Sequence, residues 1–267
     1  MDGSSAKSPL SSEAQGHASF NDRIRGMEMY WRVAAGIIAM LYVGGVAAEE
    51  AAPAAPPLPS EKNGTASAST SNSKPVIAMP DATPGDYWTY EVRDEIGGTV
   101  TEVRKVMVTE VTPKEIAMRF TVVGSERSGP IIYDRGWNVR LSGASKYSPN
   151  DGTGVELPLT VGKTWKIKSD EISSANGFTF KRTGSSRVTG QESITTKGGT
   201  FEAFVVETSY STQNTRDPTR RSEVAARTWY SPDIDHWVKR AVTIRQGGHL
   251  MQQIGIELTA YGRKGNT

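Results

Sequence analysis

Alternation of apolar and polar residues is the feature that most constrains how this 267-residue chain can fold. It extends from Pro84 to about Tyr261, and a period of two puts every second side chain on one face of a strand. No 3.6-residue period lasts three turns in this region, so we expect strands with one buried face and no helices. Three runs show the alternation, the last of them more loosely: Ile116, Met118, Phe120 and Val122; Ile254, Ile256, Leu258 and Ala260; Val238, Arg240, Val242 and Ile244.

Residues that favour tight turns separate these runs. Gly and Asn tolerate a positive φ, which two-residue hairpin turns require. Together the runs and turns predict an antiparallel all-β domain of about ten strands, which forms a barrel, a half-barrel or a sandwich. The turn sites are Gly97–Gly98, Asn150–Gly152, Asn176–Gly177, Gly198–Gly199 and Gly247–Gly248.

An internal echo indicates a duplicated plan. The segment Gly85–Tyr90 resembles Gly162–Ile167, since each has the pattern G-x-x-W at the start of a predicted strand. Charged hairpins follow each copy, and then comes a strand rich in aromatic and β-branched residues, 119–123 in one case and 201–206 in the other. The echo predicts two similar β-meanders that close on each other, with the two Trp side chains packed at the ends of the sheet.

The N-terminal part predicts export. Residues 33–48 are uncharged and end in Val46-Ala47-Ala48, the small residues of a signal-peptide cleavage site. As a helix they would span about 24 Å, less than the hydrocarbon core of about 30 Å. We interpret 1–48 as an N-terminal extension and signal peptide, or as an uncleaved anchor. Either way the rest of the chain is periplasmic or secreted, or is held at the inner membrane facing the periplasm.

The remaining chain divides into a spacer, a domain and a tail. Residues 49–80 are rich in Ala, Pro and Ser without apolar periodicity, so they predict a disordered linker. Residues 81–263 form the predicted β-rich domain, and 264–267 form a short tail. Any membrane contact is expected only through residues 33–48, if the leader stays uncleaved.

Composition excludes several classes of chemistry. The chain has no Cys, which rules out disulfides, thiolate zinc sites, a Cys nucleophile and a lipidated Cys after the signal peptide. The formal net charge of +2 provides no long-range attraction for nucleic acid, so we expect no such partner.

No catalytic residues, metal site or cofactor are predicted. The sequence has no G-x-S-x-G motif, and the densest cluster of ligand-type residues is Asp233, Asp235 and His236. A metal site needs three or more convergent ligands, whereas the run SPDIDHW is typical of a turn between two strands.

Several structural motifs occur in an order that resembles bacterial secreted proteins of uncharacterised function. After the G-x-x-W pattern come Val188–Glu192, Gly199–Phe204, Thr228–Asp233 and Trp237–Arg240. The resemblance covers roughly residues 84–261 and implies a sheet similar to the curved half-barrel of lipoprotein carriers. It implies no functional residues. The family pattern usually has a Gly near Asp235 and His236, and this chain has none there.

The functional prediction is a binding module of the cell envelope. A curved sheet can hold a lipid or another apolar ligand against its concave face, and Trp137, Phe120 and Phe204 are the candidate lining residues. Arg220 and Arg221, in the basic loop 215–221, are candidates for contact with a lipid head group. Two alternatives remain, a non-enzymatic structural or interaction protein that binds an envelope protein, and a hydrolase. An open apolar cavity would favour the carrier, and a filled interior the interaction protein.

Overall fold

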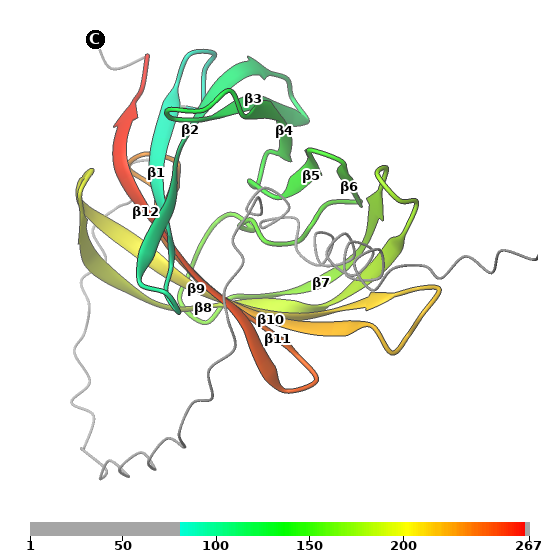
Figure 1. Ribbon diagram of the computed structural model, residues 1–267. Helices are drawn as coiled ribbons and strands as arrows, with labels where there is room; N and C mark the ends of the chain where they lie inside the picture. The colour runs from blue at the N-terminus through cyan, green and yellow to red at the C-terminus, as the bar shows by residue number, and fades with distance from the viewer. Residues whose placement is uncertain (1–80, 265–267) are drawn as a thin grey trace, which may run out of the picture.

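The computed structural model describes residues 81–264 (Figure 1). The predicted signal segment and linker, together with residues 265–267 of the predicted tail, lie outside the described residues. Within 81–264, no helix is long and apolar enough to cross a membrane. The strands are β1 (Tyr87–Asp94), β2 (Thr99–Val111), β3 (Glu115–Val122), β4 (Ser128–Asp134), β5 (Val139–Ser142), β6 (Ser145–Ser148), β7 (Thr164–Ser173), β8 (Thr179–Thr196), β9 (Gly199–Asn214), β10 (Arg221–Ser231), β11 (His236–Gln246) and β12 (His249–Gly262).

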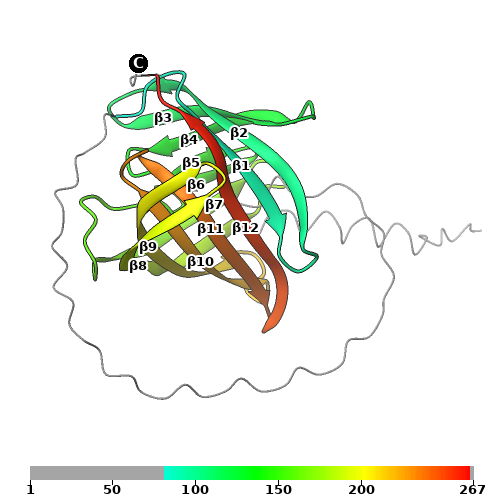
Figure 2. The ribbon, with the colours of Figure 1, turned by 90° about the vertical axis from the view of Figure 1, so that its left-hand side faces the viewer.

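The strands form one closed antiparallel barrel in which each strand pairs with the next along the chain (Figures 1 and 2). The barrel closes where β1 pairs with β12, and Trp88 lies opposite Tyr261 on one side and Val106 on the other. The predicted all-β antiparallel class is confirmed, but the half-barrel and the sandwich are wrong. The number of strands is twelve rather than about ten, because β5 and β6 have only four residues each. Such short strands contain too few alternations to be recognised.

The two G-x-x-W segments have equivalent surroundings. Gly85 N–H donates to the Val108 carbonyl (2.9 Å) of β2, and Gly162 N–H donates to the Val188 carbonyl (2.8 Å) of β8. In both copies the amide of that Val donates back to the residue after the Gly. The glycines have φ values of 99° and 92°, a left-handed region that favours glycine over other residues. The echo in the sequence therefore marks the start of each half of the barrel, β1–β6 and β7–β12.

Two apolar clusters fill the barrel, and a polar layer lies between them. The larger cluster contains Trp88, Trp137 and many aliphatic side chains, and the smaller one contains Tyr210. The guanidinium of Arg182 on β8 packs over Tyr147 of the larger cluster at 4.9 Å and over Tyr210 of the smaller at 4.7 Å. Arg182 therefore lies in the polar layer, between the two apolar clusters.

The connection between β6 and β7 runs back into the space that the strands enclose (Figure 1). In this inner loop, residues 149–163, the side chains of Asp151, Thr153 and Val155 are buried. Its backbone packs tightly against the β4–β5 turn, because a Cβ atom on Gly154 would lie 2.2 Å from the Gly136 carbonyl oxygen. The inner loop therefore fills part of the interior that a ligand would otherwise occupy.

Candidate functional site

A cavity of about 70 Å³ remains inside the barrel beside the inner loop. Four aromatic side chains, two arginines and several aliphatic side chains surround it. The aromatic residues come from β1, β4, the β4–β5 turn and β11, so the cavity depends on elements that are far apart in the sequence. The lining residues are Tyr90, Val92, Arg104, Val106, Ile131, Tyr133, Trp137, Val139, Ser142, Thr153, Trp237, Arg240 and Ile256. We call this space the aromatic cavity.

The aromatic wall is held in place by ring contacts and by hydrogen bonds. Tyr133 meets Trp137 edge to face with ring centroids 5.6 Å apart, and Tyr90 stacks on Trp237 at 6.2 Å. Trp137 adopts a φ of 60°, and its indole Nε1–H donates to Asp235 Oδ1 at 3.0 Å. These contacts orient the wall without any ligand, as expected of a preformed site.

Arg240 projects from β11 and lines the aromatic cavity. Its Nε–H donates to Thr228 Oγ1 (3.1 Å), its Nη2–H donates to the Thr153 carbonyl (3.5 Å), and its guanidinium lies 4.3 Å from the ring centroid of Trp237. The residue is only 5% exposed, and burial lowers the pKa of its guanidinium. Within residues 81–264, no carboxylate forms an ion pair with it.

Arg104 of β2 supplies the second cation. It pairs with Glu102, and the other carboxylate oxygen of Glu102 lies 3.3 Å from Arg127. The Nε of Arg104 is buried and has no hydrogen-bond partner within the described part of the chain. The side chain of Arg104 is 15% exposed, so it lies nearer to solvent than Arg240 does.

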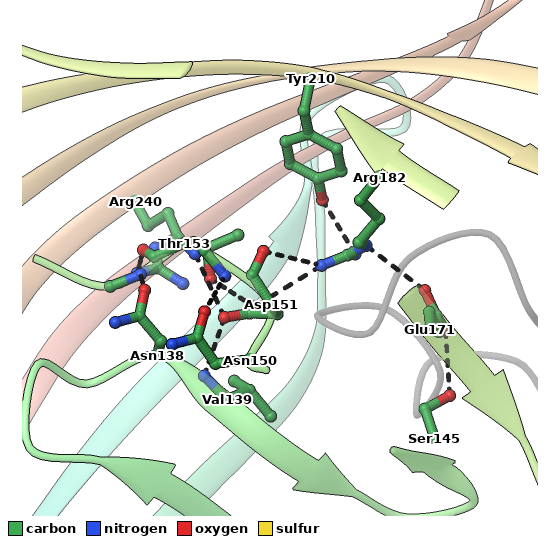
Figure 3. A network of polar contacts seen from close by, with 12 residues as sticks. Asn138, Val139, Ser145, Asn150, Asp151, Thr153, Glu171, Arg182, Tyr210 and Arg240 are labelled. Atoms are coloured by element: carbon green, nitrogen blue, oxygen red, sulfur yellow. Dashed lines mark hydrogen bonds and ion pairs between the residues drawn. The ribbon is translucent and has the colours of Figure 1, made fainter. Parts of the chain in front are cut away.

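A buried ion network adjoins the aromatic cavity (Figure 3). Arg182 lies 3.8 Å from Asp151 Oδ2 and 3.4 Å from Glu171 Oε2, and its Nη2–H donates to the Tyr210 hydroxyl at 3.1 Å. Burial raises the pKa of the Glu171 carboxyl, although Arg182 opposes that effect. Both buried carboxylates therefore form their ion pairs with Arg182, and Asp151 also acts on Arg240 at longer range.

Asp151 also ties the inner loop to the barrel. Its Oδ1 accepts a hydrogen bond from the Val139 amide (2.8 Å) and its Oδ2 accepts one from the Thr153 hydroxyl (2.5 Å). Thr153 is the residue whose carbonyl contacts Arg240. The network thus positions one wall of the aromatic cavity.

Asp233 and Asp235 lie in the turn between β10 and β11, as the sequence predicts, and His236 is the first residue of β11. His236 is fully buried, stacks on Trp88 with ring centroids 4.4 Å apart, and has Nδ1 2.6 Å from the Tyr90 hydroxyl. That hydroxyl donates its proton to the Trp237 carbonyl, so Nδ1 of His236 carries a proton and donates to Tyr90. Burial holds the pKa of His236 well below 6.5, and the ring is neutral.

The other residues of this turn do not converge on His236. Asp233 is exposed, and Asp235 accepts hydrogen bonds from Trp137 and from the Tyr230 hydroxyl. In the part of the chain that the structure describes, no group of three His, Asp or Glu side chains is arranged to hold a metal ion. Asp235 has a φ of 48°, a left-handed conformation that favours Gly over other residues.

The structure separates the predicted site residues. Trp137 lines the aromatic cavity, whereas Phe120 and Phe204 are core residues outside its lining. Arg220 and Arg221 lie at the exposed β9–β10 hairpin, where Arg220 pairs with Asp217 at 3.1 Å. A head-group contact by these two arginines stays a prediction.

Sequence reasoning missed most of the cavity. Tyr90, Tyr133, Trp237 and both cavity arginines were not among the predicted site residues. One available signal was Arg240, which alternates with Val238 and Val242 and so falls on the buried face of its strand. A buried arginine is rare enough to indicate a specific role.

No protein-family model matches this chain, and no curated protein matches it. Among solved structures, a proposed lipoprotein from Parabacteroides distasonis is 15% identical with a TM-score of 0.47, over 69% of this chain and 97% of its own. A proposed exported protein with a YmcC-like fold from Bacteroides fragilis is 14% identical with a TM-score of 0.44, over 68% and 97%. The hypothetical lipoprotein YmcC from Escherichia coli is 11% identical with a TM-score of 0.39, over 67% and 85%. These are uncharacterised exported or lipoprotein-type proteins, the class that the sequence motifs resemble. At these values no activity or ligand carries over to this chain.

Proposed function

We propose that this protein is an exported, non-enzymatic binding module of the cell envelope that holds a small apolar or amphipathic molecule in the aromatic cavity. The observation that carries the proposal is the cavity itself, an aromatic-walled space of about 70 Å³ inside the barrel. Protein interiors are normally packed with few voids larger than a water molecule. A preformed apolar space with a few polar groups is typical of small-molecule sites.

The volume limits the size of the ligand. Since one water needs roughly 10–15 Å³ of such space, the cavity has room for about five groups of that size. A small molecule or the end of an acyl chain fits these limits, and a whole lipid does not. The inner loop accounts for the small volume, because Asp151, Thr153 and Val155 occupy the rest of the interior at this level.

The geometry favours binding without chemistry. His236 is not among the residues that line the cavity, and its Nδ1–H is engaged with Tyr90. The carboxylates of Asp151 and Glu171 are directed at Arg182. Closure pairs β1 with β12 and so removes one sheet edge that an interaction protein would offer a partner, although β7 pairs with β6 only over Asp170–Ser173.

Titration of the full chain with butan-1-ol tests the proposal. We expect saturable NMR shifts of the indole N–H signals of Trp137 and Trp237, whose rings line the cavity. Trp165 and Trp229 do not line it and serve as internal controls, so their signals should stay in place. Absence of any saturable shift at Trp137 and Trp237 would overturn the proposal and favour the interaction protein.

A further inference from the structure

The geometry points to an anion subsite at the inner end of the aromatic cavity, where Arg240 binds the carboxylate of a short amphipathic acid. This inference rests on the proposed function and names the chemical class of its ligand. The apolar part of the ligand would lie against the aromatic wall, and the carboxylate would face Arg240. Nothing in the motifs of the sequence assigns such a role to this residue.

Arg240 has no carboxylate of the described residues within ion-pair distance, although Asp151 acts on its charge from farther away. Burying a guanidinium is costly unless a counter-charge and hydrogen bonds compensate for lost hydration. Arg240 has hydrogen bonds from Nε to Thr228 and, at the long limit of 3.5 Å, from Nη2 to Thr153. The described residues offer its Nη1 no hydrogen-bond partner. On Arg240, which lines the cavity, the Nη1 group therefore has no hydrogen-bond partner among the described residues, and the Nη2 group has only a long one.

The nearby carboxylates already have partners within the protein. Asp151 and Glu171 form ion pairs with Arg182, and Asp151 accepts three further hydrogen bonds. Glu102 lies between Arg104 and Arg127. Asp151 acts on Arg240 only at longer range, so a carboxylate bound in the cavity would be the first counter-ion in direct contact with its guanidinium.

The other polar groups of the cavity include the cation of Arg104 and the hydroxyl of Tyr133. Arg104 adds a second cation, with a buried Nε that has no hydrogen-bond partner within residues 81–264. Burial raises the pKa of Tyr133 to about 12, so its hydroxyl keeps its proton and can donate. No acidic side chain lines the cavity. Positive charge and donors without acidic groups select an anion.

The shape of the guanidinium and of the cavity favours a short carboxylic acid over other anions. A carboxylate is planar and accepts two parallel hydrogen bonds from a guanidinium, a geometry that adds specificity as well as energy. Val92, Val106, Ile131 and Val139 provide aliphatic surface for a short chain. With room for about five water-sized groups, a carboxylic acid of about four carbons is the appropriate probe.

The test compares butanoate with butan-1-ol, which share an apolar chain and differ in charge. Calorimetry and the Trp137 and Trp237 signals of the full chain at pH 7 would report both affinities. We expect butanoate to bind at least about tenfold more tightly, the effect of one charge-assisted hydrogen bond. Equal affinities with intact tryptophan shifts would overturn the anion subsite and leave the proposed function standing. If neither compound binds, both the anion subsite and the proposed function are overturned.

A variant pair assigns the effect to Arg240. Arg240→Met should lower the ratio of butanoate affinity to butan-1-ol affinity by about tenfold or more. Arg245→Met, on the same strand but exposed, is the matched control and should change neither. An unchanged ratio for a folded Arg240→Met protein would overturn the assignment. The comparison of the two compounds on the unaltered chain needs no variant and decides the question if Arg240→Met fails to fold.

Discussion

Asp151 of the inner loop and Arg182 of β8 place opposite charges 3.8 Å apart, although neither side chain has any exposed surface. Arg182 also forms an ion pair with Glu171, so one cation balances two buried carboxylates (Figure 3). The pair joins the inner loop to the barrel wall, and the loop in turn forms one side of the aromatic cavity. Stability and binding therefore depend on the same contact.

Removing that cation should be costly. Arg182→Met leaves Asp151 and Glu171 buried without an ion-pair partner, and we expect the free energy of unfolding to fall by about 3–5 kcal/mol. Urea denaturation followed by tryptophan fluorescence measures the loss. Arg187→Met removes an exposed arginine from the same strand and should change stability by less than about 0.5 kcal/mol. Similar values for the two variants would contradict the assigned role of Arg182.

His236 should make the fold sensitive to acid. Its pKa is lowered in the folded state by burial, so the unfolded chain binds a proton that the folded protein excludes. Stability is complete above the ordinary pKa of 6.5 and is lost as the pH falls toward the lowered value, by up to about 1.4 kcal/mol per pH unit. We expect His236→Phe to remove this part of the pH dependence.

The measurement is the free energy of unfolding between pH 7 and pH 4.5 for the unaltered chain and the variant. Because other groups titrate in both proteins, the difference between the two curves isolates His236. His249→Gln, at an exposed position, is the control and should follow the unaltered chain. A constant difference across the pH range would show that His236 does not titrate on unfolding.

Gly154 should not accept a side chain. A Cβ there would lie 2.2 Å from the Gly136 carbonyl oxygen and 2.4 Å from the Asn138 amide nitrogen, both of which are backbone atoms. We expect Gly154→Ala to displace the inner loop and to lower stability by about 1–3 kcal/mol. Gly190→Ala, where a Cβ meets nothing within 4 Å, is the matched control. Equal urea midpoints for the two variants would refute this close packing.

Much of the fold follows from local pattern. Alternation identified the strand containing Ile116 and Val122, and four of the five predicted turns join consecutive strands, because both signals depend only on near neighbours. The fifth, Asn150–Gly152, was wrong as a hairpin turn, since it lies in the inner loop between β6 and β7. The echo of G-x-x-W located the start of each half of the barrel. Strands β5 and β6 lacked enough residues to show a period. Closure is not local, since it depends on β1 pairing with β12, so a half-barrel and a closed barrel have the same local signature.

The cavity was less accessible to sequence reasoning. Alternation shows which residues share a face, and it placed Arg240 correctly among buried neighbours. It does not show which side chains meet across the barrel. Tyr90 and Trp237 stack because β1 and β11 both flank β12, and Trp137 reaches the cavity from a turn with a left-handed φ. Phe204 also lies in a segment rich in aromatic and β-branched residues, yet it packs in the core and does not line the cavity.

Pairing of the first strand with the last has a consequence for how the domain matures. Tyr87 finds its partner Gly262 only after every intervening strand has been made available, so the final seam has a very high contact order. Vectorial delivery across a membrane would present β1 first and β12 last. Until then β1 has β2 on one side and unpaired backbone on the other. The arrival of β12 thus determines when the exposed edge of β1, which favours aggregation, becomes paired.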